Sequence, residues 1–424
     1  MMSKYFLPDW VQDLKLNPIK SHGSYLYDDS SGREILDMFG FFSTLPLGYN
    51  HPIFKRQEYI NDILSFGGIK PSTGRISSGY VDEFISKFHR FANNKINIFE
   101  KYFFIHGGGL AVENALKISF DWKKSIIHNY DRKEEDLEVI SFNKSFHGVT
   151  GYTISISDND LKTKGFPRFN WPKFDAPAIS FLNSENATSV LRTKEDSTLN
   201  GIRNYIRERG SEKISSIIIE LIQGGGGDRH FSSYFILGLR KICNDNEILF
   251  IVDEVQTGFG VTGSVWYFEQ IGVTPDLITF GKKSQISGVC INDKIVGMNE
   301  VLNVPGRLSP TWNGDIDDYI RCSHIIKAYD EFGMISNAKI QGEKILSELR
   351  QIKLLDNVRG KGLLIAFDFS DKETRNKFNQ YCFNKGLLLL PMKDKTLRMR
   401  PNMAVNIDEI DQSLSIINDV SKII

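Results

Sequence analysis

The sequence has few cysteines, no surplus of charge of either sign and no long apolar run. Its 424 residues include four cysteines, and 52 basic residues balance 52 acidic ones. The balanced charge argues against binding to nucleic acid or anionic lipid and favours a small-molecule partner. The cysteines form neither a CxxC pair nor a zinc-type spacing, so we expect free thiols, a cytoplasmic location and no metal site. They are Cys243, Cys290, Cys322 and Cys382.

Segments that would direct the chain into a membrane are also missing. No apolar run approaches the roughly 20 residues that a membrane helix needs. The opening MMSKYFLPDWVQDLKL lacks the charged and then apolar regions of a signal peptide, so we expect none. The apolar fraction of 41% and the charged fraction of 25% are ordinary for a soluble globular protein, and the length predicts two or more lobes.

The chain does contain a regular alternation of short apolar runs with helix-length amphipathic segments. This alternation predicts an α/β fold in which a mainly parallel central sheet is covered on both faces. The predicted strands are 102–105, 137–142, 217–220, 248–253 and 277–280, with a helix at 234–244. Towards the C-terminus the pattern predicts a helical region at 317–351, strands at 363–367 and 386–390, and a helix at 407–422.

We therefore expect a large ligand-binding domain at residues 51–307. An N-terminal segment, 1–50, and a C-terminal part, 308–424, would together form a smaller α+β domain beside it. No internal repeat or low-complexity segment interrupts this arrangement.

Ligands bind parallel sheets at the carboxyl ends of the strands, and four features of this chain fall there. The glycines at 107–109 open a predicted helix whose free N–H groups could hold a phosphate, although an ordinary tight turn is the plain alternative. Asp253 ends a very apolar strand, where a carboxylate could keep a pyridine nitrogen protonated. An isolated acidic pair such as Asp253–Glu254 is more often a helix cap or a surface turn.

The other two features are a lysine and an aromatic ring. Lys282 follows the apolar run LITF, where a buried amine could act as a nucleophile, although most lysines are solvated. Phe146 follows the strand at 137–142 and could stack on a flat heterocycle, although such a residue is usually core or loop. The order of phosphate turn, aromatic ring, acid and lysine indicates an enzyme that uses pyridoxal 5'-phosphate (PLP).

On these motifs the chain resembles the class III aminotransferases, which are PLP-dependent transferases of fold type I, and among them the L-lysine 6-aminotransferases. The resemblance covers essentially the whole length. Its motifs are GGGLAVENALKISFDWK, SFHG followed by GYTISIS, LIQGGGGDRHF, LFIVDEVQTGFGVTGSVW, PDLITFGKKSQ, RLSPTWNG and LRMRP. It implies transfer of an amino group from a primary amine to a 2-oxo acid such as 2-oxoglutarate.

The resemblance also implies roles for individual residues. Lys282 would form the Schiff base and move the proton, with Lys283 as the alternative, and Asp253 would pair with the pyridine nitrogen. Thr311 would bind the phosphate of a neighbouring subunit's cofactor, which makes a homodimer the expected unit. The other predicted cofactor contacts are Gly108 and Gly109 at the phosphate, Phe146 and Val255 on the ring faces, Gln256 at the ring hydroxyl, and His147 and Glu220.

Two departures from the family pattern concern the substrate end. Arg398 matches the arginine that grips the carboxylate of 2-oxoglutarate or glutamate. In L-lysine 6-aminotransferases a glutamate in IQGEGG pairs with this arginine when lysine enters, but Gly225 stands at that position here. Those enzymes also carry an arginine straight after FHG that holds the far carboxylate of lysine, and here that residue is Val149.

Both departures predict that the amine donor is not free L-lysine. Loss of a charge-assisted partner is worth about 1.5–3 kcal/mol in binding. Without the gating glutamate, Arg398 should lack a neutralising partner and always favour an acid. The expected donor is a diamine, a modified amino acid or an amino acid bound to a carrier. The alternative is that another arginine replaces the missing one, with Arg75 and Arg168 as candidates.

Other functions are compatible with parts of the pattern. An aminomutase, decarboxylase or racemase of the same fold would share Asp253 and Lys282, and Arg398 favours transamination over them. A non-catalytic PLP-binding protein would usually have lost the lysine or gained a DNA-binding domain, and neither is seen. A nucleotide-binding enzyme is disfavoured because GGGLAVEN fits neither the G-x-G-x-x-G nor the Walker pattern.

Overall fold

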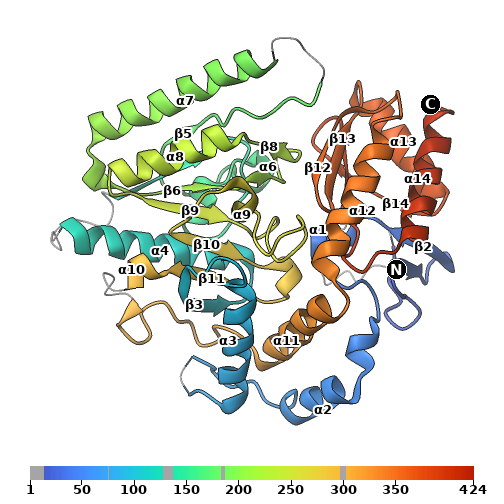
Figure 1. The fold of residues 1–424 in the computed structure, drawn as a ribbon, viewed down its shortest axis with the longest axis horizontal. Coiled ribbons are helices and arrows are strands. Elements are labelled where there is room, and N and C mark those ends of the chain that lie inside the picture. Colours follow the sequence, from blue (N-terminus) through green and yellow to red (C-terminus); the bar gives the residue numbers. More distant parts are fainter. Residues whose placement is uncertain (1–13, 75, 128–136, 183–186, 297–301) are drawn as a thin grey trace.

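The computed structural model describes residues 14–74, 76–127, 137–182, 187–296 and 302–424 (Figure 1). Its largest sheet has seven strands in the order β3–β11–β10–β9–β6–β4–β5. The pairs from β10 through β9, β6 and β4 to β5 are parallel, and β11 runs antiparallel to both neighbours. The prediction of a mainly parallel sheet is confirmed. The strands are β3 (Phe99–Ile105), β4 (Glu138–Phe142), β5 (Lys173–Phe174), β6 (Ile214–Ile219), β9 (Leu249–Asp253), β10 (Leu277–Phe280) and β11 (Ser287–Asn292).

Helices cover both faces of this sheet. Helix α4 (Gly108–Ile127) packs on one face, and α8 (Ser233–Asp245), backed by α7 (Ala187–Arg209), packs on the other (Figure 1). Alternate residues of β9 serve the two faces: Leu249 and Ile251 share an apolar cluster with α4, whereas Phe250 and Val252 share one with α8. A strand buried on both faces has an unbroken apolar sequence, which is why ILFIVD predicted it.

The two ends of the chain meet in the smaller α+β domain. Strand β2 (Arg33–Asp37) pairs with β1 (Tyr25–Asp28) and, in parallel, with β14 (Leu387–Leu388). An antiparallel sheet in the order β12–β13–β16–β15 lies beside it. The predicted boundaries at residues 50 and 307 stay predictions. The remaining elements of this domain are β12 (Asp356–Lys361), β13 (Leu364–Asp368), β15 (Leu390–Met392), β16 (Thr396–Met399), α12 (Met334–Leu349), α13 (Lys372–Asn384) and α14 (Ile407–Ser421).

Three details differ from the sequence prediction. The helical region at 317–351 is two helices, α11 (Ile316–Glu331) and α12, because Gly333 between them has φ +61°, outside the helical region. Helix α11 packs on α2 (Gln57–Phe66) and α3 (Gly79–Ala92). The strand predicted at 386–390 is divided between β14 and β15, which belong to different sheets. Strand β11 was not predicted, because its sequence SGVCIN is too mixed to form an apolar run.

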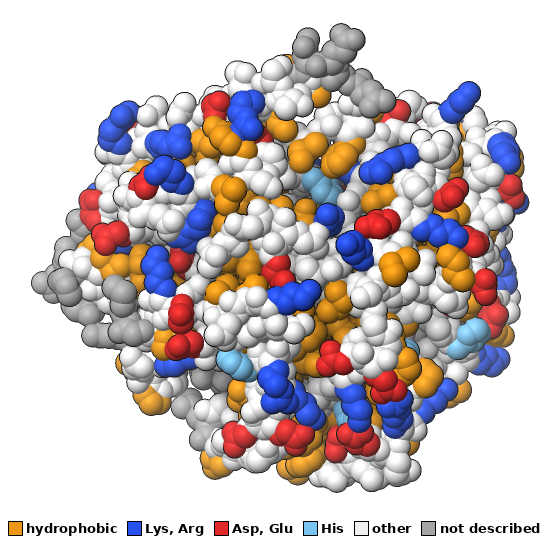
Figure 2. Space-filling model, viewed as in Figure 1, with side chains coloured by type: hydrophobic (Ala, Val, Ile, Leu, Met, Phe, Trp, Pro, Cys, Tyr) orange, Lys and Arg blue, Asp and Glu red, His pale blue; other side chains and the backbone are white. Residues whose placement is uncertain are grey.

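The face drawn in Figure 2 carries no strong bias of charge. Basic and acidic side chains are interspersed across it, as expected from equal numbers of the two kinds. Among the described residues, no helix is both long and apolar enough to cross a membrane.

A glycine in α12 provides a test of how closely this helix packs on the small sheet. A Cβ at Gly342 would overlap the backbone carbonyl oxygen of Gly362, in the turn between β12 and β13. Alanine usually stabilises a helix by about 1 kcal/mol relative to glycine. Here we expect the opposite: Gly342→Ala should lower the free energy of unfolding by about 1–3 kcal/mol, measured by urea denaturation.

The matched control is Gly79→Ala at the first residue of α3, where nothing lies within 4 Å of an added Cβ. This variant should be neutral or slightly more stable. Equal losses of stability in the two variants would contradict the packing described for α12.

Candidate active site

A cavity of about 240 Å³ lies at the carboxyl ends of the central strands. It brings together residues that are far apart in the sequence and that follow β3, β4, β6, β9 and β10. All of the predicted cofactor contacts line it except Thr311, which is exposed. The lining residues are Gly108, Gly109, Phe146, His147, Gly148, Glu220, Asp253, Val255, Gln256 and Lys282.

The carboxylate of Asp253 is held by three donors. Oδ2 lies 2.7 Å from Nδ1 of His147, and Oδ1 accepts from the Val255 N–H and the Thr279 hydroxyl, both at 3.0 Å. Because an ionised carboxylate only accepts hydrogen bonds, Nδ1 of His147 is the donor. Asp253 and His147 are both buried, so this arrangement fixes a negative charge at the base of the cavity.

The two neighbouring lysines have different surroundings. Lys282 lines the cavity, whereas Lys283 is fully buried and its Nζ donates to the carbonyl oxygen of Gln256 at 2.7 Å. Burial, followed by the nearby charge of Arg398, lowers the pKa of Lys282 to about 8. Lys282 also has φ +54°, a conformation that costs a residue other than glycine about 1 kcal/mol or more.

The glycine turn after β3 lines one side of the cavity, and it leaves little or no space for side chains at positions 108 and 109. Helix α4 begins at Gly108, so its first N–H groups are free of partners within the helix. A Cβ on Gly108 would lie 2.9 Å from Cγ1 of Val255, and one on Gly109 would lie 3.3 Å from Cα of Gly148. The turn therefore leaves backbone N–H groups at a helix N-terminus beside the cavity, an arrangement that suits an anion such as phosphate.

Glu220 supplies a second buried carboxylate, just after β6. Its Oε1 accepts from the Phe146 N–H at 2.8 Å, and its Oε2 accepts from the Gly224 N–H at 3.2 Å. Burial raises the pKa of Glu220 to about 7, with His147 opposing the shift and Asp253 adding to it.

Arg398 lies next to the cavity, and it has an acidic neighbour that the sequence analysis missed. Its Nη1 donates to the Gly224 carbonyl oxygen at 2.9 Å and lies 3.4 Å from Oδ1 of Asp228. Asp228 also receives both of its 2.6 Å bonds from Nη2 of Arg400. Burial alone would raise the pKa of Asp228, but the charges of Arg400 and Arg398 outweigh it and hold that pKa below its ordinary value.

The expectation that Arg398 lacks any neutralising partner is therefore wrong, because Asp228 partly neutralises it. The only signal for Asp228 in the sequence was an acid directly after four glycines. Thr279 was the other missed residue; it lies opposite Asp253 in the register of β9 and β10.

The positions that depart from the family pattern lie near the cavity. Val149 follows the lining residue Gly148 and is 38% exposed, so a longer side chain has room there. By contrast, position 225 has no room for a longer side chain, because a Cβ on Gly225 would lie 2.9 Å from the Cβ of Phe146. Of the two candidate replacement arginines, Arg168 is exposed, does not line the cavity and contacts the Thr163 hydroxyl. Arg75 lies outside the described residues.

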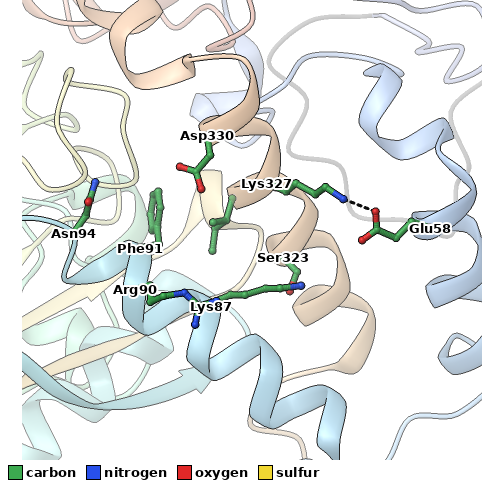
Figure 3. A pocket seen from close by; sticks show the side chains of 9 residues that line it. Glu58, Lys87, Arg90, Phe91, Asn94, Ser323, Lys327 and Asp330 are labelled. Carbon is green, nitrogen blue, oxygen red and sulfur yellow. Dashed lines mark hydrogen bonds and ion pairs between the residues drawn. The ribbon is translucent and has the colours of Figure 1, made fainter.

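A larger cavity, of about 490 Å³, lies between α2, α3 and α11 and contains no predicted site residue (Figure 3). Its lysines are largely neutralised: Lys327 pairs with Glu58, and Lys87 pairs with Glu83 at 2.8 Å. Size alone does not identify a site, and the smaller cavity holds the converging titratable groups.

Comparisons with known proteins find similar chains over nearly the whole length of this one. A family model described as aminotransferase class III matches residues 6–421. An L-lysine-epsilon aminotransferase of Streptomyces clavuligerus is 33% identical over 411 residues, which cover 95% of this chain and 89% of that protein. A mitochondrial 4-aminobutyrate aminotransferase of Sus scrofa is 28% identical, with 95% and 83% covered. The solved structure of the lysine aminotransferase from M. tuberculosis in its internal aldimine form matches with a TM-score of 0.92 at 33% identity, covering 99% of this chain and 97% of that one.

The contrast between the two lysines leads to a chemical prediction. In cofactor-free protein, acetic anhydride should modify Lys282 at a rate that reaches half its maximum near pH 8, because the lowered pKa yields neutral amine there. Lys283 should be protected by burial and by its bond to Gln256. Peptide mass spectrometry across pH measures both rates, and preferential modification of Lys283 would contradict the assignment.

Proposed function

The chain belongs to the class III aminotransferases, and we propose that it moves an amino group from a lysine-like primary amine other than free L-lysine to a 2-oxo acid such as 2-oxoglutarate. It is a PLP-dependent enzyme. The observation that carries the proposal is the cavity itself. Its base holds Lys282 and Asp253, while Val149 and Gly225 stand where the lysine enzymes carry charged side chains.

The residues of the cavity fit PLP. Asp253 uses three of about four acceptor positions on its carboxylate, which leaves capacity for the N–H of a pyridine ring. The α4 N-terminus at Gly108 and Gly109 would take the phosphate, and Val255 and Phe146 would pack on the two faces of the ring. When bound, the cofactor supplies an electron sink and stores the amino group between the two half-reactions.

The protein's own contribution is proton transfer and electrostatics. Lys282 is the base that would remove the proton from the substrate carbon and return it at C4' of the cofactor. Its lowered pKa keeps an appreciable fraction of the amine neutral near pH 8, as a base requires. Asp253, held in place by hydrogen bonds from His147 and Thr279, would pair with the ring nitrogen and favour its protonated form.

The choice of donor follows from the substrate end. Val149 offers no charge to a carboxylate at the far end of a lysine molecule, and none of the residues that line the cavity is an arginine. A donor whose far end has no carboxylate, is amidated or is carried on another molecule loses nothing by this. Arg398 remains available for the carboxylate of the 2-oxo acid, to which it could offer a bidentate pair.

We also propose that the working unit is a homodimer in which Thr311 reaches the cofactor of the other subunit. Thr311 is exposed and does not line the cavity of its own chain, which suits a contact made across an interface. A cytoplasmic location is proposed as well, on the ground that all four cysteines are buried free thiols.

A donor screen tests the proposal directly. The holoenzyme is mixed with L-lysine, L-lysinamide or 1,5-diaminopentane, and the spectral conversion of PLP to its amino form is timed in a single half-reaction. We expect at least one of the two donors without a free carboxylate to react about tenfold or more faster than L-lysine. L-Glutamate, the reverse substrate, is the control for a competent site. Fast conversion by free lysine alone would overturn the proposed donor class.

Val149 should respond to the return of a charge. Val149→Arg is expected to raise kcat/KM for free L-lysine by about tenfold to a hundredfold, because the far carboxylate regains a charge-assisted partner. Val149→Met, which adds length without charge, is the matched control and should leave L-lysine a poor donor. An equal gain in both variants would show that charge at this position does not select the donor.

A further inference from the structure

One residue, Gly224, connects the substrate arginine with a buried acid through its two backbone polar groups. The Gly224 N–H donates to Oε2 of Glu220 at 3.2 Å, and the Gly224 carbonyl oxygen accepts from Nη1 of Arg398 at 2.9 Å. Glu220 lines the cavity, whereas Arg398 is 2% exposed beside it. The carboxylate and the guanidinium are therefore held in fixed positions on either side of Gly224.

Arg398 is only partly neutralised in this structure. Both oxygens of Asp228 accept short hydrogen bonds from Arg400, whereas the distance from Oδ1 of Asp228 to Nη1 of Arg398 is 3.4 Å. One carboxylate thus serves two buried guanidinium groups, and Nε of Arg398 has no partner among the described residues. A buried positive charge that is only partly compensated is costly, and a further anion nearby would lower that cost.

No moving carboxylate can supply that anion from the glycine run at 224–227. Besides the contact of Gly225 with Phe146, a Cβ on Gly226 would lie 2.9 Å from the Lys144 carbonyl oxygen. The run is also clamped from β12, because Arg359 donates to the carbonyl oxygens of Gly227 and Asp228. This wall of the site is packed and bonded in one conformation.

Among the described residues, Glu220 is a buried acid besides Asp228 whose charge acts on Arg398. The groups that act on its charge come from four surrounding segments: His147 after β4, Asp253 at the end of β9, Lys282 after β10 and Arg398 in β16. Burial, opposed by His147 and reinforced by Asp253, gives it a pKa of about 7, so both protonation states are accessible near neutral pH.

We propose that Glu220 is the charge-compensating residue of the substrate site: it is ionised when no anion lies at Arg398, and it takes up a proton from solvent when the carboxylate of the acid substrate binds there. Proton uptake would compensate the charge of the bound carboxylate without movement of an acidic side chain or of the backbone. This inference rests on the proposed function, because it assumes that Arg398 receives the carboxylate of the 2-oxo acid.

The sign of the pH dependence follows from this linkage. A bound carboxylate adds negative charge near Glu220 and raises its pKa further, so binding consumes protons. Affinity for the acid should therefore fall as pH rises from about 7, by up to about tenfold for a rise of one pKa unit in the complex. A ligand that brings no anion to Arg398 should show no such dependence on Glu220.

Calorimetry of the PLP holoenzyme with glutarate, an unreactive dicarboxylate, counts these protons. Titrations at about pH 7.5 in two buffers of different ionisation enthalpy should give uptake of about half a proton per site. Glu220→Gln should abolish most of this uptake, while Glu220→Asp, which retains a titratable group, should keep part of it. The protonation of Lys282 is followed separately from the absorbance of the cofactor and subtracted.

Glu254→Gln is the matched control. Glu254 is also fully buried, burial raises its pKa to about 7, and it does not line the cavity. Its replacement should leave the proton count unchanged.

Absence of proton uptake in the wild-type enzyme between about pH 6.5 and 8.5 would overturn the proposal, whatever the stability of the variants. Unchanged uptake in Glu220→Gln would overturn it as well. Failure of the proposed function would be seen differently, as failure of 2-oxoglutarate to return the amino form of the cofactor to PLP.

Discussion

The geometry of the whole site depends on the three hydrogen bonds that hold the carboxylate of Asp253. One donor, Thr279, is the residue opposite Asp253 in the register of β10 and β9, and another, His147, reaches it from beyond the end of β4. A slip of one residue between β9 and β10 would move Thr279 to the other face of the sheet. The buried charge would then lose a donor, at a cost of about 1–3 kcal/mol. The register of β9 and β10 therefore constrains the site, because it decides whether Thr279 can donate to Asp253.

The same constraint extends to the small domain through the hairpin β7 (Ile222–Gln223) and β8 (Arg229–His230). Three arginines of the small domain bind its loop. Arg359 in β12 binds backbone carbonyls, while Arg398 in β16 and Arg400 directly after it bind Gly224 and Asp228. Because these groups are buried, each unmade bond would leave an unpaired charge or carbonyl. The loop thus locates Arg398 relative to strands that belong to a different sheet.

The sequence was sufficient for features that depend on local pattern. ILFIVD and LITF predicted β9 and β10, and the motif order selected Lys282, whose side chain lines the cavity. It was insufficient where the cause is a contact between distant residues. Asp228 meets Arg400, 172 residues later, and no periodicity in the chain signals that pairing. The division of 317–351 at Gly333 was missed because one glycine seldom outweighs a long helical pattern.

The two ends of the site differ in how completely their buried charges are satisfied, and this difference bears on substrate binding. At the cofactor end both oxygens of Asp253 have donors within the protein. At the substrate end Nε of Arg398 has no hydrogen-bond partner in the part of the chain that the structure describes, and leaving such a group unsatisfied costs about 1–3 kcal/mol. A substrate carboxylate that accepts from this N–H would satisfy a buried donor that is unpaired in the free enzyme. Part of its binding free energy would therefore come from removing that cost. An amine donor without a carboxylate at that position gains nothing from Arg398 and must find its affinity elsewhere in the cavity. Under the proposed function, discrimination between the amine and the acid would depend on how the charge of Arg398 is balanced. Because the glycines at 224–227 are tightly packed and carry no side chain, that balance would rest on Asp228 and Glu220.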